Sequence, residues 1–147
     1  MPVNQLRNVV QRQNLVTAPP SATVFETIRI MTEGHIGAIP IIEDGTLVGV
    51  FSERDLMQRV VAAERRPRET FVAEVMTRDV VTATLEEAVD TCLEKMKRAG
   101  CRHLPVLVND RVVAMVAMRD LLREEIEERG DEIRFLRAYL HQKPLND

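Results

Sequence analysis

Aromatic residues and cysteines are scarce in this sequence, which limits what the chain can build. Its 147 residues include no tryptophan, one tyrosine and four phenylalanines. The core must therefore be aliphatic, and an aromatic stacking platform for single-stranded nucleic acid is not expected. Cys92 and Cys101 are the two cysteines. They are too few for a zinc site or a disulfide framework, so we interpret both as free thiols in a reducing compartment.

Excess positive charge and long apolar runs are also missing. The formal net charge of −3 removes the usual electrostatic attraction to nucleic acid or to an anionic membrane. The polar segment 1–12 lacks the apolar centre of a signal peptide, and the longest apolar run, 112–118, is too short to span a bilayer. We therefore expect a soluble, cytoplasmic protein with no nucleic-acid or membrane partner.

Motifs for catalysis are absent as well. The sequence contains no glycine-rich phosphate loop, no HExxH and no CxxC, and no Ser/His/Asp or Cys/His constellation stands out. We therefore expect no enzyme: no catalytic residue, no metal site and no required cofactor. The hydrophobic fraction of 45% is nevertheless sufficient for the core of one compact domain or of two small halves.

An internal repeat is the main feature that the sequence does contain. A shift of 65 residues superposes Val16-Thr17-Ala18 on Val81-Thr82-Ala83, and Arg54-Asp55-Leu56 on Arg119-Asp120-Leu121, without a gap. The same shift aligns further identical pairs, namely Met31 with Met96, Pro40 with Pro105, and Val48 with Val113. One register that superposes identical residues along the whole chain predicts a duplicated structural unit.

Each copy predicts the same order of elements: a leader helix, a short strand, a helix, a β-hairpin and a final helix. In the first copy they are expected at 4–10, 14–17, 23–33, 38–42 with 46–51, and from Glu53 onward. In the second copy they are expected at 70–76, 79–82, 85–99, 103–108 with 111–117, and from Met118 onward. Gly34 and Gly100 are expected to end the two longer helices.

The strands do not alternate strictly, which predicts sheets covered by helices. A unit of about 60 residues buries too little surface to be stable alone. We therefore expect an α/β (α+β) fold in which two β-α-β-β-α repeats pack sheet to sheet with pseudo-twofold symmetry. The predicted boundaries are 1–62 for repeat 1, 63–69 for a polar linker, and 70–125 for repeat 2.

A C-terminal helical extension is expected at 126–147. An apolar stripe runs into it, formed by Leu122, Ile126, Ile133, Leu136 and Leu140 and broken by Arg129 and Gly130. Such a stripe packs either on its own domain or on a second subunit. We favour a contact in a homodimer.

The segment 39–56 combines a hairpin with the start of a helix. Glu43-Asp44-Gly45 is typical of a hairpin turn, and Ser52 stands at a helix N-cap with Asp55 three residues later. A helix N-terminus of this kind suits a phosphate or a ribose. An aspartate here can equally serve only to stabilise the helix dipole.

The motifs carried by both copies are characteristic as a set. They are VTAPP (16–20), GAIPI (37–41), LVGV (47–50) and SERDL (52–56), then EVMT (74–77), VVT (80–82), RHLPV (102–106) and AMRDL (117–121). This pattern, over about residues 4–125, resembles the cystathionine-β-synthase (CBS) domain family. The resemblance implies a stand-alone pair of CBS domains, called a Bateman module.

Paired CBS domains bind adenosine-containing ligands (AMP, ADP, ATP or S-adenosylmethionine) in clefts between the repeats. In the family, the aspartate of the Ser/Thr-x-x-Asp segment accepts hydrogen bonds from the ribose hydroxyls. By resemblance, Asp55 holds the ribose in one cleft and Asp120 in the other. An ionised carboxylate suits this role because it can accept from both hydroxyls of a cis-diol.

Further contacts to base or phosphate are implied by the same resemblance. Ser52 occupies the Ser/Thr position of the first copy, but Ala117 replaces it in the second, which predicts two unequal sites. Arg102 and His103 are placed to reach phosphates, whereas Gly37 and Ala38 leave room for an adenine ring or simply pack closely. The remaining candidates for base or phosphate are Thr17, Ala18, Pro40, Arg54, Thr82, Pro105 and Arg119.

Two functions are compatible with these residues. The first is a regulatory module that binds an adenine nucleotide or S-adenosylmethionine and passes a conformational change to an unidentified protein partner. The second is a dimerising scaffold whose clefts have degenerated, which the alanine at position 117 favours. A role on DNA is third, because no recognition helix is identifiable in this acidic chain.

Overall fold

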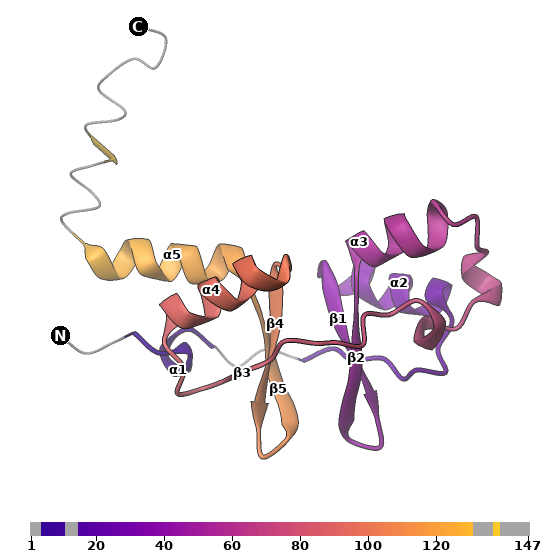
Figure 1. The fold of residues 1–147 in the computed structure, drawn as a ribbon, viewed down its shortest axis with the longest axis horizontal. Coiled ribbons are helices and arrows are strands. Elements are labelled where there is room, and N and C mark those ends of the chain that lie inside the picture. Colours follow the sequence, from indigo (N-terminus) through magenta and orange to yellow (C-terminus); the bar gives the residue numbers. More distant parts are fainter. Residues whose placement is uncertain (1–3, 11–14, 131–136, 139–147) are drawn as a thin grey trace, which may run out of the picture.

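Two β-hairpins lie side by side at the centre of the molecule, and helices flank each of them (Figure 1). The computed structural model describes residues 4–10, 15–130 and 137–138. One hairpin is β1 (Ala38–Glu43) with β2 (Thr46–Ser52), and the other is β4 (His103–Val108) with β5 (Arg111–Ala117). Both β1 and β2 contact β5, so the two sheets pack against each other.

The register of the hairpins confirms the 65-residue repeat. Ala38 lies opposite Ser52 in the first hairpin, and His103 lies opposite Ala117 in the second. Each hairpin also carries a β-bulge at the equivalent place, after Ile41 and after Val106. Both turns use two residues with positive φ, as two-residue hairpins of the favoured type require. These residues are Asp44, Gly45, Asn109 and Asp110.

The helices follow the predicted order with small shifts. The longer ones are α2 (Val24–Gly34), α4 (Val89–Ala99) and α5 (Met118–Arg129), and α1 (Leu6–Val9) is a single turn. A short helix α3 (Glu53–Asp55) continues as a π-helical segment, Leu56–Val61. Short 3-10 turns occupy Pro67–Glu69 and Val72–Glu74.

The first predicted strand of each copy is wrong in the described residues. Segments 15–17 and 79–82 form no strand. Parallel pairing begins just after them, at Ala18 opposite Ile41 and at β3 (Ala83–Thr84) beside β4. The valine-rich segments looked like strands from composition, but Val80 and Val81 line a cleft instead of pairing with a neighbour.

Two helix ends also differ from the prediction. The second long helix begins at Val89 and not at 85, because Thr84 and Glu87 form a turn in which the Glu87 carboxylate accepts from the Thr84 N–H at 2.8 Å. In the first half, Gly34 remains inside α2 and His35 takes the left-handed position with φ 53°. Gly100 takes that position in the second half, as predicted, with φ 68°.

Each half has its own core, and each core includes residues from the leader segment that precedes the other repeat in the sequence. Val72, Val75 and Met76 are buried in the core of the first half, although they come after the linker. Leu6, from the N-terminal leader, is buried in the core of the second half. The exchange is tied by matching backbone hydrogen bonds, from the Val24 N–H to the Thr70 carbonyl and from the Val89 N–H to the Asn4 carbonyl, both 2.8 Å.

The C-terminal extension is only partly covered by the structure. Helix α5 passes the predicted boundary at 125 and ends at Arg129, just before Gly130. The predicted stripe beyond that point, at positions 133, 136 and 140, lies outside the described residues. Within the part of the chain that the structure covers, no helix has the length and apolar character needed to cross a membrane.

Candidate functional site

A cleft of about 470 Å³ opens between the two halves, within the usual size range of small-ligand sites. We call it the inter-half cleft. Its walls come from the end of β2 and the start of α3, from the segment 77–81, and from the turn between α4 and β4. The apolar part of its lining consists of Ala38, Val50, Met57, Val80, Val81 and Ala99.

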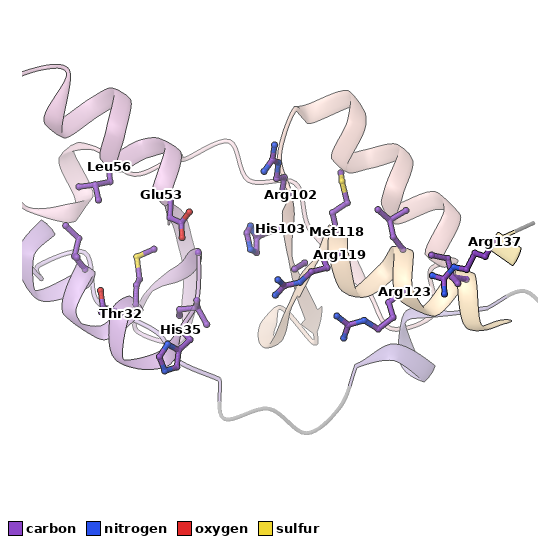
Figure 2. A pocket seen from close by; sticks show the side chains of 17 residues that line it. Thr32, His35, Glu53, Leu56, Arg102, His103, Met118, Arg119, Arg123 and Arg137 are labelled. Carbon is purple, nitrogen blue, oxygen red and sulfur yellow. The ribbon is translucent and has the colours of Figure 1, made fainter. Parts of the chain in front are cut away.

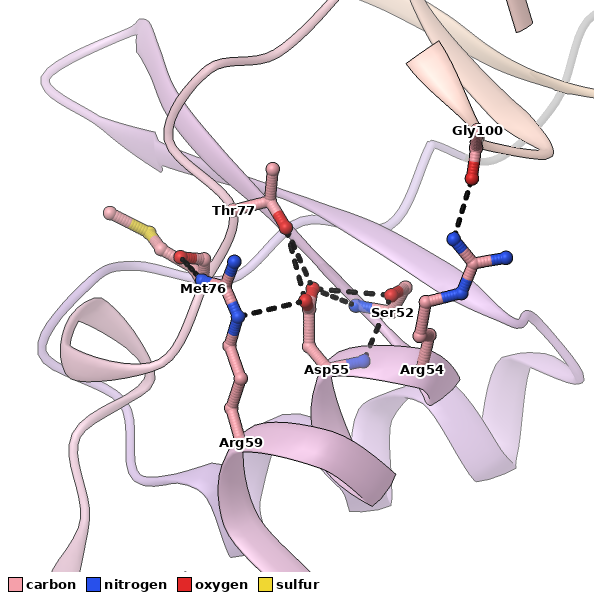
Figure 3. Close-up of polar contacts among 7 residues, drawn as sticks. All are labelled: Ser52, Arg54, Asp55, Arg59, Met76, Thr77 and Gly100. Carbon is pink, nitrogen blue, oxygen red and sulfur yellow. Dashed lines mark hydrogen bonds and ion pairs between the residues drawn. The ribbon is translucent and has the colours of Figure 1, made fainter. Parts of the chain in front are cut away.

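The carboxylate of Asp55 is the centre of the polar network in this cleft (Figure 3). It accepts hydrogen bonds from the Ser52 N–H at 3.0 Å and from the Ser52 hydroxyl at 3.1 Å. The Thr77 hydroxyl lies 3.0 and 3.2 Å from its two oxygens. Asp55 is only 6% exposed, and a buried carboxylate needs several donors of this kind.

The local sequence explains why these groups meet. Ser52 ends β2 and caps α3, and its hydroxyl accepts from the Asp55 N–H at 3.2 Å, which completes the predicted capping box. Thr77 arrives from the other direction, because the chain returns from the linker and pairs with β2. The Val50 N–H donates to the Thr77 carbonyl at 2.9 Å, and the Thr77 N–H donates to the Val50 carbonyl at 2.8 Å.

Two arginines brace the cleft. Arg54 donates from Nη1 to the Gly100 carbonyl at 2.6 Å, a bond that joins the first half to the second (Figure 3). Arg59 donates to the Met76 carbonyl at 2.9 Å, and its Nε lies 3.6 Å from Asp55 Oδ1. The position of Asp55 is therefore fixed from the helix, from β2 and from the returning chain.

His103 lies where the inter-half cleft meets a second cavity. Burial lowers the pKa of His103 below its ordinary value of 6.5. The carboxylates of Glu53 and Asp120 act on this pKa in the opposite direction, and Arg102 adds to the lowering. A negatively charged ligand here would favour the protonated imidazole.

The second cavity has a volume of about 1150 Å³, and we call it the basic pocket. Figure 2 shows Arg102, His103, Arg119 and Arg123 on the side of the second half, facing Glu53 of the first half. Arg137 also lines it. The apolar part of its lining comes from both halves and includes Ile28, Met31, Leu56, Leu122 and Ile126.

The structure brings about half of the sequence-predicted site residues to these cavities. The inter-half cleft is lined by Gly37, Ala38, Ser52, Arg54, Asp55, Arg102 and His103, and the basic pocket adds Arg119. The others lie elsewhere. Ala18, Pro40 and Pro105 are buried in or beside the sheets, Thr17 is exposed, and the Thr82 carbonyl accepts a hydrogen bond from Lys95.

The two ribose candidates have different surroundings. Asp120 sits in the first turn of α5, half-buried, and lines neither cavity. The Ala117 side chain cannot cap α5, so Asp120 lacks the hydroxyl partner that Ser52 gives to Asp55. By the 65-residue shift, the position equivalent to Thr77 that would accompany Asp120 is 12, which lies outside the described residues.

Ten residues of the inter-half cleft were not expected from the sequence, namely Val50, Glu53, Met57, Thr77, Asp79, Val80, Val81, Ala99, Gly100 and Cys101. Those between 77 and 81 were assigned to the second repeat, and only the exchange of leaders places them beside Asp55. The motif EVMT was visible in the sequence, but nothing local to it indicated which half it would join. Among residues 4–10, 15–130 and 137–138, no group of three His, Cys, Asp or Glu side chains could hold a metal ion.

Comparison with known proteins identifies the fold. The family model described as "CBS domain" matches this chain twice, at residues 6–62 and 72–127. The chain belongs to the CBS domain family. It is therefore a tandem CBS protein, with one CBS repeat in each match.

Individual relatives agree with this assignment. The chain is 31% identical over 107 residues to the CBS domain-containing protein YhcV of Bacillus subtilis, covering 73% of this chain and 76% of that protein. It is 28% identical over 123 residues to the mitochondrial CBS domain-containing protein CBSX3 of Arabidopsis thaliana, covering 80% of this chain and 60% of that protein. The chain thus spans less than two thirds of the plant protein.

A solved structure carries ligands of interest. The CBS domain pair of protein MJ0100, in complex with 5-methylthioadenosine and S-adenosyl-L-methionine, superposes with a TM-score of 0.77 at 26% identity. The match covers 86% of this chain and 99% of that one. CBS domain pairs of the same overall fold therefore include one that holds adenosine-containing molecules.

Proposed function

We propose that this CBS pair is a non-catalytic regulatory module that binds an adenosine-containing ligand in the inter-half cleft. The observation that carries the proposal is the buried carboxylate of Asp55, which faces a cleft of ligand size and is braced by Ser52 and Thr77. A braced carboxylate is an acceptor ready for a sugar diol. The two hydroxyls that donate to it keep free lone pairs and so add acceptors at the same place.

The rest of the cleft suits the other parts of such a ligand. Val50, Val80 and Val81 form an apolar surface on which an adenine ring can lie. Arg102 and His103, at the opposite side, come from the second half of the molecule. A ligand that spans the cleft would therefore contact both halves at once.

Contact with both halves gives a route for regulation. The Arg54 bond to the Gly100 carbonyl already joins the halves beside the cleft. A bound ligand would favour one relative arrangement of the repeats, and the change would reach a partner protein as a population shift. The regulatory ligand would be AMP, ADP, ATP or S-adenosylmethionine.

Calorimetry with these four compounds and the full chain tests the proposal. We expect at least one to bind, and we expect Asp55→Asn to abolish that binding, with Asp120→Asn as the matched control. Failure of all four to bind at millimolar concentration would reject an adenosine ligand. A melting scan gives a second readout, since saturation at about 100 times the Kd stabilises a protein by about 2.7 kcal/mol.

The alternative is a dimerising scaffold, and one observation favours it. Leu122 of α5 is 47% exposed, and it lies with Ile126 in the lining of the basic pocket. The double variant Leu122→Glu/Ile126→Glu puts charge on this surface, and both positions lie outside the lining of the inter-half cleft. If the scaffold function is correct, this variant should abolish the homodimer in light scattering, whereas the sensor function predicts that ligand binding survives.

A further inference from the structure

Phenylalanine is scarce in this chain, yet two of its four phenylalanines lie at the surface of the first half. Phe51 is fully buried, which is the common place for this residue. Phe71, in contrast, is 53% exposed, and Phe25 in the first turn of α2 is half-buried. A single exposed apolar side chain is ordinary, but a group of them indicates a contact with another molecule.

Backbone contacts bring these two aromatic residues together. Phe71 forms an isolated antiparallel bridge with the N-cap residue of α2. The 3-10 turn Pro67–Glu69 contacts α2, and the Arg68 guanidinium lies over the Phe25 ring, 3.8 Å from its centroid. Arg29 follows one turn later on the same face of α2. We call Phe25, Arg29, Arg68 and Phe71 the aromatic patch, which lies on the side of the first half that faces away from the second half (Figure 1).

The charged groups of this region leave two arginines without a carboxylate. Glu26, Glu69 and Glu74 are the carboxylates there, and each already accepts hydrogen bonds from nearby groups of its own half. Arg29 and Arg68 form no ion pair in the described part of the chain. The patch therefore combines apolar area with positive charge that is available to another molecule.

The second half shows that the fold does not require this patch. Three of its four positions have a counterpart there, two by the 65-residue shift and one by the matching bridge to the N-cap residue of α4. The counterparts are Asp90 for Phe25, Glu94 for Arg29 and Gln5 for Phe71. The same scaffold thus carries polar or acidic residues at these positions, so the stability of a repeat does not account for the aromatic and basic ones.

The chemistry of the patch indicates what kind of molecule it fits. Aromatic residues and arginine are enriched at the centre of protein interfaces, where a few of them contribute most of the binding free energy. Unpaired guanidinium groups favour a partner that supplies carboxylates, which they bind in a bidentate manner. Arg68 remains able to donate while it lies on Phe25, because its N–H groups point outward in the plane of the guanidinium.

We propose that the aromatic patch is a docking site for an acidic segment of a partner protein that also carries large apolar side chains. Its carboxylates would bind Arg29 and Arg68, and an apolar side chain would pack on Phe71. A single-stranded nucleic acid also supplies negative charge and flat rings, but the net charge of −3 opposes its binding. The inference needs no ligand in the inter-half cleft, so it stands independently of the proposed function.

Fluorescence anisotropy with the full chain and two labelled synthetic peptides tests the inference. The acidic peptide consists of glutamate and leucine with a tryptophan, and the basic peptide has lysine in place of every glutamate. We expect only the acidic peptide to bind. Phe71→Gln and Arg68→Gln should each weaken its binding by about tenfold or more. Glutamine is the residue that the second half carries at the position of Phe71, so the fold should survive, which a melting scan verifies.

Matched controls separate the patch from general effects of charge and apolar surface. Val108 is an apolar residue at the end of β4 with 37% exposure, and Arg98 is an exposed arginine of α4. Val108→Gln and Arg98→Gln should both keep the wild-type affinity for the acidic peptide. Arg68→Lys retains the charge but loses the planar guanidinium, so it should bind the acidic peptide more weakly than the wild type. Because Arg68 is exposed, its variants keep the test valid if Phe71→Gln proves unstable.

Three results would overturn the inference. They are failure of the acidic peptide to bind at millimolar concentration, equal binding of the two peptides, and binding of the acidic peptide that Phe71→Gln and Arg68→Gln leave unchanged. Displacement of the acidic peptide by a single-stranded oligothymidine would assign the patch to nucleic acid and would also reject the proposal. None of these results bears on the proposed function, which calorimetry of the cleft tests separately.

Discussion

The hydroxyl of Thr77 lies 3.0 Å from the carboxylate of Asp55, although 22 residues and the whole linker separate them in the chain. This bond joins the start of α3 to the segment that returns along β2. Thr77 belongs to the second repeat in the sequence, but in the structure it lies in the first half. There its hydroxyl helps to fix Asp55, the proposed ribose acceptor.

Replacement of Thr77 tests the importance of this bond. Thr77→Val keeps the shape of the side chain but removes the donor, so we expect the free energy of unfolding to fall by about 1 kcal/mol. Ligand affinity in the cleft should fall as well, because Asp55 loses a group that fixes it. Urea denaturation and calorimetry measure the two effects. Thr77→Ser retains the hydroxyl and should behave like the wild type; equal loss in both variants would contradict the prediction.

Gly49 permits the close approach of the returning chain to β2. A Cβ at this position would lie 2.5 Å from the Met76 sulfur and 2.9 Å from the Thr77 carbonyl oxygen. That oxygen cannot retreat without loss of its bond to the Val50 N–H. We expect Gly49→Ala to lower the free energy of unfolding by roughly 1–3 kcal/mol and to weaken ligand binding.

Gly34→Ala is the matched control for this substitution. The nearest neighbours of a Cβ at Gly34 are side-chain atoms of Ile36 and Val16 at 3.7 and 3.8 Å, an ordinary contact distance. Its stability should stay within about 0.5 kcal/mol of the wild type or rise slightly. Identical melting temperatures for the two variants would show that the contact at Gly49 is not limiting.

The stability of the protein should depend on pH through His103. Because burial lowers its pKa in the folded state, the unfolded chain binds a proton more readily near the ordinary value of 6.5. Stability is therefore greatest above that pH and falls as the pH decreases toward the folded pKa. His103→Gln should flatten this part of the profile, which denaturation at a series of pH values measures. An unchanged profile would assign the dependence to other groups.

The two cysteines should differ in reactivity. Burial raises the pKa of the Cys92 thiol to about 11, and its side chain is fully enclosed in the second core, so it should not react in the folded protein. Cys101 is half-buried and lines the inter-half cleft. We expect a thiol reagent to modify Cys101 alone and a ligand in the cleft to slow the reaction. Cys101→Ser removes the signal if the assignment is correct.

The sequence was most informative where structure depends on local chemistry. The 65-residue shift predicts both hairpins, and the Asp44-Gly45 turn and the Ser52 capping box can be predicted from residue types alone. The prediction failed where a segment could pack against either half of the molecule. The motif around Thr77 has a short-range pattern of its own, but its partner is chosen by packing of Val72, Val75 and Met76 in the distant core. The predicted strands at 14–17 and 79–82 failed for a related reason, since β propensity does not specify a neighbour.

The crossed leaders also constrain how the protein can be made. The first core stays incomplete until residue 76 has been synthesised, because Val72, Val75 and Met76 belong to it. The second core includes Leu6 together with residues as late in the chain as Leu121. The segment around Leu6 therefore cannot pack into its core until nearly all of these residues have been synthesised. Such long-range contacts slow folding. They also mean that a cut in the linker cannot yield two independent domains, since each fragment would carry the other's missing piece.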